Sequence, residues 1–175
     1  MQFFKINAFL DFRGHTAALF DNSIADSLDF HLCQINQGYS LKAGTLRGLL
    51  FQTMPYEQAK LVQVLHGSIY NVAVDIRPES STFGTYYAEI LSFENQKIAY
   101  IPRGFAHGYL TLEDNTLMQW CVDNDFCSEA ARCLRYNDLD IHSENGERGI
   151  RWPWDFAMLI LSDKDRSGQS LKSLR

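Results

Sequence analysis

The chain has 175 residues, 46% of them hydrophobic and 21% charged, and a formal net charge of -5. This length and composition predict one globular domain, residues 1–175, with a full hydrophobic core. The negative charge argues against a nucleic-acid partner held by counterion release, and no apolar run approaches the roughly 20 residues of a membrane helix. The N-terminus lacks the charged-then-apolar pattern of a signal peptide, so we expect a cytoplasmic protein with no membrane partner.

The first fifty residues contain several segments with the apolar pattern of strands. We predict strands at residues 3–10, 30–36 and 44–52. Residues 16–27 fit a short helix or a strand, because their periodicity does not decide between the two. The sequence Gln-Gly-Tyr-Ser at 37–40 is expected to end the second of these strands.

The middle of the chain is dominated by β-branched residues and regularly spaced turn signals. Residues 60–65 and 68–76, separated by His-Gly, predict a β-hairpin. Four further strands are predicted at 84–92, 96–101, 107–112 and 116–122. Short strands at this spacing are typical of an all-β sandwich or barrel.

The last third of the chain has fewer strand signals. Residues 128–133 are predicted to form a helical turn capped by Ser128, and residues 142–149 a polar loop. We expect the polar tail from residue 167 onwards to be mobile. The four cysteines have no metal-ligand or redox-motif spacing, so we interpret them as reduced, buried thiols of a cytosolic protein.

Two basic residues, Arg47 and Lys60, stand among residues that are otherwise typical of a core. Lys and Arg are rarely buried without a partner. A strand that carries them inward usually directs them at an anion or at charge that develops during a reaction. The alternative is that both are solvated residues at a strand edge.

Eight ordered motifs cover nearly the whole chain. They are Asp11-x-Arg13-Gly14, Gln34-x-Asn36, Leu46-Arg47-Gly48, Gln58-Ala-Lys60-Leu-Val, Val72-Ala-Val-Asp75-x-Arg77, Ile101-Pro-x-Gly-Phe-Ala-His107-Gly, Trp152-Pro153 and Leu161-Ser-x-Lys-Asp165. In these motifs and their spacing the chain resembles the dTDP-4-dehydrorhamnose 3,5-epimerase family. The resemblance implies a cupin-type jelly roll with short C-terminal helical segments, a homodimer with exchanged N-terminal strands, and no metal or organic cofactor.

The chemistry implied by this resemblance is proton transfer next to a ketone. The 4-keto group of a nucleotide-linked 6-deoxyhexose makes the hydrogens at C3 and C5 acidic, so that a base forms an enolate and reprotonation on the other face inverts the carbon. Lys60 matches the residue that stabilises the enolate, and Arg13 the residue that pairs with the diphosphate. The resemblance assigns four more residues to the ligand site: Gln34, Asn36, Arg47 and His107.

The chain departs from the family pattern at the positions of both the catalytic base and the catalytic acid, among others. Leu50 occupies the place of the catalytic histidine, although Asp165 matches the aspartate that orients that histidine. By spacing, Trp120 occupies the place of the proton-donating tyrosine, and an indole does not transfer a proton at neutral pH. Phe126 remains as an aromatic residue that can stack on the nucleotide base.

These departures leave three interpretations open. The first is an altered epimerase that inverts one centre, C3, with Asp165 or His107 as the base. The second is a non-catalytic nucleotide-sugar-binding homologue that acts as a regulator or partner. The third is a sugar lyase or isomerase that uses the same enolate chemistry. We expect a role in deoxysugar or surface-polysaccharide biosynthesis, with the nucleotide (dTDP, CDP or GDP) left open.

Overall fold

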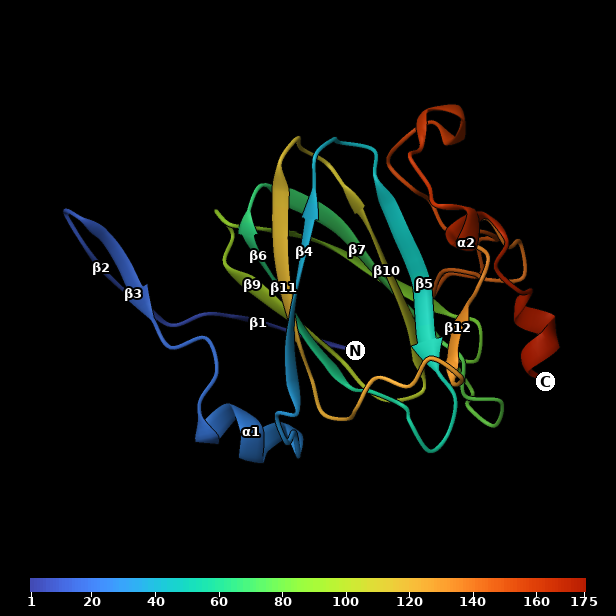
Figure 1. Cartoon of the computed structure of the whole chain (residues 1–175), viewed down its shortest axis with the longest axis horizontal. Coiled ribbons are helices and arrows are strands. Elements are labelled where there is room, and N and C mark those ends of the chain that lie inside the picture. The colour runs from blue at the N-terminus through green and yellow to red at the C-terminus, as the bar shows by residue number, and fades with distance from the viewer.

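A computed structural model describes all 175 residues and shows two five-stranded antiparallel sheets that face each other (Figure 1). In spatial order the first sheet consists of β1 (Gln2–Lys5), β9 (Lys97–Ile101), β6 (Lys60–His66), β11 (Thr116–Val122) and β4 (Gln34–Ser40). The second consists of β12 (Ala131–Cys133), β5 (Leu46–Gln52), β10 (Phe105–Thr111), β7 (Ser68–Asp75) and β8 (Tyr86–Ser92). This arrangement confirms the predicted all-β, cupin-type jelly roll.

The remaining elements lie outside the two sheets. A separate hairpin consists of β2 (Ala8–Asp11) and β3 (Gly14–Ala17). The helical elements are short, as predicted for the C-terminal part: α1 (Asn22–Leu28), the 3-10 helix η1 (Phe156–Met158), α2 (Asp163–Arg166) and the 3-10 helix η2 (Leu171–Leu174).

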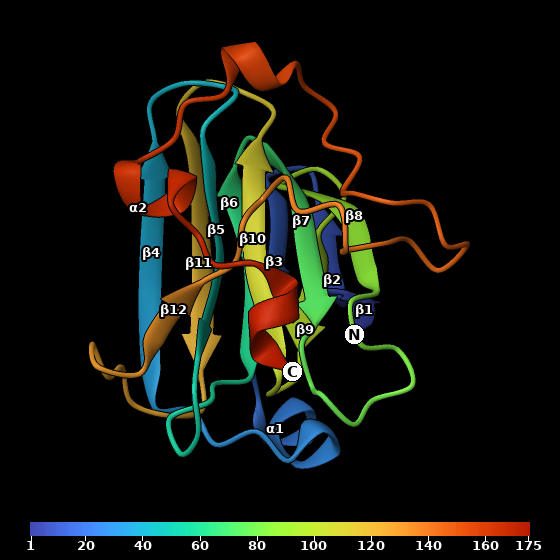
Figure 2. The same ribbon diagram turned by 90° about the vertical axis from the view of Figure 1, so that its right-hand side faces the viewer.

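The second sheet is buried on both faces, which explains why β7 is buried along nearly its whole length. Toward the first sheet it contributes Ala73 and Phe105 to the interior of the sandwich, where they meet Val62 of β6. On its other face, Val72 packs with Trp152 and neighbouring residues of the C-terminal segment. Figure 2 shows this segment, with α2, lying across the second sheet.

The outer face of the first sheet is covered at one end by the segment around α1. Asp21 caps the helix by accepting a hydrogen bond from the backbone N–H of Ile24 at 2.9 Å. The Phe30 side chain beyond the helix is fully buried against Leu61 of β6 and Cys121 of β11. The alternation of β6 therefore sends Lys60 and Val62 into the sandwich and Leu61 out toward the helix.

Most predicted strands are confirmed to within a few residues. The extent of the strand predicted at 3–10 and the break predicted at 37–40 were wrong. The strand expected at 3–10 is divided into β1 and β2, because β1 pairs with β9 while β2 turns away to pair with β3. The ambiguous segment 16–27 holds the end of β3 and most of α1. β4 continues through the break expected at 37–40, because every one of its residues pairs with β11.

In the C-terminal third, the helical turn predicted at 128–133 and the mobile tail predicted from residue 167 were also wrong. Residues 131–133 form β12 instead of a helical turn, since they pair with β5 in a register that sets Ala131 opposite Gln52 and Cys133 opposite Leu50. The tail contains η2, whose Leu171 is buried in the cluster between the second sheet and the C-terminal segment. Apolar burial therefore anchors a segment whose composition is polar.

The hairpin β2–β3 projects from the body of the sandwich (Figure 1). Its apolar side chains are in solvent: Phe9 is 83% and Phe12 97% exposed. Two adjacent strands alone are marginal in water, and a cluster of exposed aromatic residues is typical of an interaction surface.

Candidate active site

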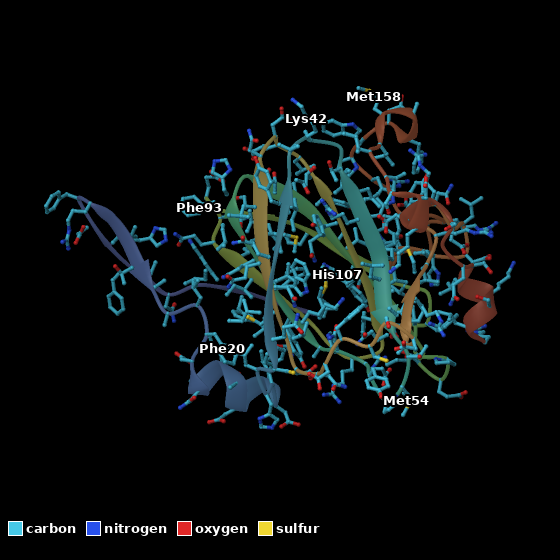
Figure 3. All side chains as sticks on the ribbon, in the orientation of Figure 1. Phe20, Lys42, Met54, Phe93, His107 and Met158 are labelled. Carbon is cyan, nitrogen blue, oxygen red and sulfur yellow. The ribbon has the colours of Figure 1, made fainter.

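A cavity of about 330 Å³ opens between the two sheets and the C-terminal segment. Strand alternation directs inward-facing residues of β6, β10 and β11 toward it, and α2 closes one side. His107 lies near the middle of the sandwich (Figure 3). Six residues assigned to the site from the sequence line this one cavity: Arg47, Lys60, His107, Trp120, Phe126 and Asp165.

The cavity carries an excess of positive charge. Four cationic residues line it, Arg47, Lys60, Arg132 and Lys164, and the only carboxylate is that of Asp165. None of these four cations belongs to an ion pair of the structure. In a protein of net charge -5 this concentration of unpaired cations favours an anionic ligand.

Lys60 and Arg47 have different environments within the cavity. Burial lowers the pKa of the Lys60 amine to about 8, because removing an ammonium from water disfavours its charged form. The Arg47 guanidinium donates hydrogen bonds to the Ser40 hydroxyl at 3.4 Å and to the Tyr39 carbonyl at 3.3 Å. These two long bonds leave the rest of its donors available to a ligand.

His107 is buried, and its Nε2 lies 2.9 Å from Oδ1 of Asn71. Burial and, secondly, the charge of Lys60 hold the pKa of His107 well below its usual range, so the ring is neutral at pH 7. In the tautomer that donates Nε2–H to Asn71, Nδ1 is a free acceptor. The Asn71 Nδ2 group has no hydrogen-bond partner, so this pair beside the cavity keeps both a free donor and a free acceptor.

The Asp165 carboxylate is held at the wall formed by β5 and α2. Its Oδ1 accepts the Gly48 backbone N–H at 3.1 Å, and its Oδ2 accepts the Ser162 hydroxyl at 2.7 Å. Asp165 is only 7% exposed, yet it lines the cavity. The two bonds fix the carboxylate next to the strand that carries Leu50.

The loop after β11 places Phe126 at the cavity mouth. Gln52 fixes this loop, because its side chain donates to the carbonyls of Tyr56 and Asp125 and accepts the backbone N–H of Cys127 at 2.7 Å. Phe126 itself is 63% exposed, so its ring is accessible for stacking on a nucleotide base.

Three of the residues predicted to bind ligand are not in the cavity. Arg13 lies on the projecting hairpin, where it pairs with Asp11 at 2.7 Å. Gln34 and Asn36 are on β4, the edge strand of the first sheet, and hydrogen-bond to each other. Asn36 stands opposite Trp120 in the register of β4 and β11. Gln34 and Asn36 therefore lie on the face of the first sheet that borders the cavity, at the rim of the cavity.

Sequence reasoning missed several residues of the cavity. Gln52, Tyr109 and Arg132 line it although none was assigned to the site. The signal for Tyr109 was present, because it follows His107 by two residues in a strand and therefore faces the same way. Arg132 gave no such signal, because its strand, β12, was predicted to be helical.

No group of three or more His, Cys, Asp or Glu side chains in the structure is arranged to hold a metal ion. No helix has the length and apolar character needed to cross a membrane.

The fold and the cavity together define a cupin-type protein with a cationic small-molecule site between its sheets. The family model described as dTDP-4-dehydrorhamnose 3,5-epimerase matches residues 1–173. A relative of that name from Sinorhizobium fredii is 39% identical over 146 residues, which cover 83% of this chain and 71% of the relative.

Two solved structures are closely similar as well. The epimerase of Bacillus anthracis, with TDP and PPi bound, has a TM-score of 0.88 and 35% identity, covering 96% of this chain and 92% of that chain. The Legionella pneumophila enzyme, in complex with dTDP-4-keto-L-rhamnose, has a TM-score of 0.88 and 32% identity, covering 97% and 87%. The chain belongs to the dTDP-4-dehydrorhamnose 3,5-epimerase family, whose members are dTDP-sugar epimerases of deoxysugar biosynthesis.

Proposed function

We propose that this protein is a cytoplasmic epimerase that inverts one centre, C3, of a nucleoside diphosphate 4-keto-6-deoxyhexose in surface-polysaccharide biosynthesis. The observation that carries this proposal is the cavity in which Arg47, Lys60, Arg132 and Lys164 face a single carboxylate. A diphosphate brings two negative charges to such a site, and an enolate formed next to the 4-keto group adds another.

The chemistry assigned to the cavity needs a base and a stabiliser of the enolate oxygen. Asp165 is the first candidate for the base, because its carboxylate lines the cavity and is fixed by Gly48 and Ser162. Lys60 stabilises the enolate when it is protonated. His107, neutral and hydrogen-bonded to Asn71, holds the sugar and is the second candidate for the base.

The restriction to one centre follows from the residues at the two departures. Leu50 cannot accept a proton and Trp120 does not donate one at neutral pH, so the family pair of acid and base is absent. The acidity of the carbon next to a ketone remains, because it is a property of the substrate. A replacement base at a different position from the family base is expected to reach only one of the two acidic carbons.

We further propose that the protein is a homodimer in which the hairpin β2–β3 reaches the cavity of the partner subunit. Within its own chain, Arg13 is outside the cavity, and the exposed Phe9, Leu10 and Phe12 have no apolar surface to pack on. A second copy supplies such a surface and gives Arg13 access to a bound diphosphate.

A direct test is incubation of the protein with dTDP-, CDP- and GDP-linked 4-keto-6-deoxyhexoses in D₂O, with deuterium at C3 and C5 followed by NMR. We expect deuterium at C3 alone. Binding of a nucleotide sugar in calorimetry without exchange at either carbon would support the alternative, a non-catalytic binding protein that acts as a regulator or partner. The absence of binding by all three nucleotide series would overturn both.

A further inference from the structure

Tyr109 is a titratable residue that lies beside the proposed sugar site. The proposed mechanism gives its side chain no role. It is 6% exposed and lines the cavity from β10. Its ring lies 6.3 Å from that of His107, centroid to centroid, at an interplanar angle of 30°. A sugar that is bound by His107 therefore lies within reach of the Tyr109 hydroxyl.

The hydroxyl of Tyr109 extends across the sandwich to the first sheet. A Cβ atom on Gly38 of β4 would lie 3.0 Å from the Tyr109 hydroxyl oxygen and 3.2 Å from Cζ3 of Trp120. The phenol oxygen and the indole edge thus both border the space that a side chain at Gly38 would fill. The phenol comes from β10, but it ends beside the residue that replaces the tyrosine expected on β11.

The surroundings of this hydroxyl suit a proton donor. Burial is the largest effect and raises the pKa of Tyr109, and the charge of Asp165 acts in the same direction. The charge of Arg47 and a hydrogen bond with the Ser40 hydroxyl act in the opposite direction. The O–H therefore stays protonated at neutral pH, while Arg47 and Ser40 are in position to stabilise the phenolate formed for a moment by proton transfer.

We propose that Tyr109 is the catalytic acid of this site and delivers the proton that completes inversion, in place of a tyrosine at position 120. The inference rests on the proposed epimerase function. Asp165 is fixed at β5 of the second sheet, whereas the Tyr109 hydroxyl abuts β4 and β11 of the first. The two groups approach the cavity from different walls, as inversion at a single carbon requires.

The proton balance of the step is simple. The base takes the proton from C3, and the electron pair of that C–H bond moves into the enolate. The Tyr109 O–H bond then breaks and its proton forms a new C–H bond on the opposite face of C3, while the ketone is restored. The base ends protonated and Tyr109 ends as phenolate, and water returns both groups to their starting states.

The test is Tyr109→Phe, which removes only the hydroxyl. With dTDP-4-keto-6-deoxyglucose in D₂O we expect the C3 epimer to form at least about 100-fold more slowly, the usual contribution of an acid group. Deuterium should still enter C3 of the recovered substrate with the configuration retained, because the base returns a proton on its own face. Affinity for dTDP and the melting temperature report whether the fold and the nucleotide site are intact.

Two further variants make the result specific. Tyr70→Phe removes a hydroxyl from a half-buried tyrosine that packs on Trp152 away from the cavity, and it should epimerise like the wild type. Trp120→Tyr in the Tyr109→Phe background should restore part of the inversion, since it returns a phenol to the neighbouring position.

The possible failures are distinguishable. Wild-type inversion rates in Tyr109→Phe would overturn the role of Tyr109 and leave the proposed function standing. Loss of exchange together with loss of inversion in Tyr109→Phe would also overturn it, because it would make Tyr109 necessary for proton removal. No exchange in the wild type with any 4-keto nucleotide sugar would overturn the proposed function, and the acid role with it.

Discussion

Leu50 of β5 and His107 of β10 stand opposite each other in the register of these two strands. At the expected position of the family base there is therefore an isobutyl group, and the imidazole that faces it is neutral. The one carboxylate that lines the cavity is that of Asp165, which accepts the backbone N–H of Gly48 on the same strand as Leu50. The consequences of this arrangement can be measured.

Asp165→Asn should abolish deuterium exchange at C3, with a loss of about 100-fold or more, while dTDP-sugar affinity changes less than about twofold. Asparagine keeps an oxygen to accept the Gly48 N–H but cannot take a proton from carbon. NMR exchange and calorimetry measure the two effects. Asp163→Asn, an exposed position in the same helix, is the matched control. Exchange that survives in Asp165→Asn and disappears in His107→Asn would transfer the role of base to the histidine.

Leu50→His combined with Trp120→Tyr should restore measurable epimerisation at both C3 and C5. The substitutions return an imidazole next to Asp165 and a phenol on β11, and the cationic residues that bind the substrate are untouched. The readout is deuterium at both carbons together with product configuration. Each single variant serves as a control, because only the pair returns the base and the acid to the positions that they have in the family pattern. Continued exchange at C3 alone would mean that the cavity differs from a two-centre site at more than these positions.

The affinity for dTDP should fall as the pH rises above about 8. Burial lowers the pKa of Lys60 to about 8 in the free protein, and a bound diphosphate favours the ammonium. Below pH 8 the amine is already charged, so binding takes up no proton there. Above pH 8 binding must take up a proton, and affinity should drop by up to about tenfold per pH unit.

Calorimetry at pH 9 in buffers of different ionisation enthalpy should therefore detect uptake of about one proton per site. Lys60→Met should bind more weakly and lose this uptake. The same pH dependence in Lys60→Met would assign the titration to another group.

Arg13→Ala should weaken nucleotide-sugar binding by about 1.5–3 kcal/mol, the range for a hydrogen bond to a charged group. The loss is expected in calorimetry with dTDP-sugar and should be absent for the free sugar. Arg148→Ala changes an exposed arginine that pairs with Asp140 outside the cavity, and it should bind normally. Unchanged affinity of Arg13→Ala for every nucleotide sugar would separate the hairpin from the ligand site.

The exchange of hairpins has its own test. When Arg13→Ala and Lys60→Met chains are unfolded and refolded together, a dimer with exchanged hairpins contains one site with both residues intact. We expect epimerase activity at low substrate concentration to exceed that of either variant alone. A hairpin that served its own chain would leave both sites of the mixed dimer defective, and the mixture would show no gain. Light scattering of the wild type should give twice the mass of the chain.

The sequence determined the class of fold and most of the charged groups of the cavity. Alternating apolar runs with turn signals between them predicted strands from β5 to β11 because the period of two is a local property of the chain. The ordered motifs likewise identified Lys60, His107 and Asp165, which the structure brings to one cavity.

Tertiary structure decided what no local pattern contains. β12 became a strand because β5 offers it an edge, and Leu171 anchors the tail because the second sheet has an apolar face to cover. Arg13 lies outside the cavity of its own chain, and the Tyr109 hydroxyl of the second sheet comes close to Gly38 of the first sheet, on the side where Trp120 lies, only because the two sheets face each other. Contacts between sheets join residues that are distant in sequence, so neither relationship can be derived from spacing along the chain.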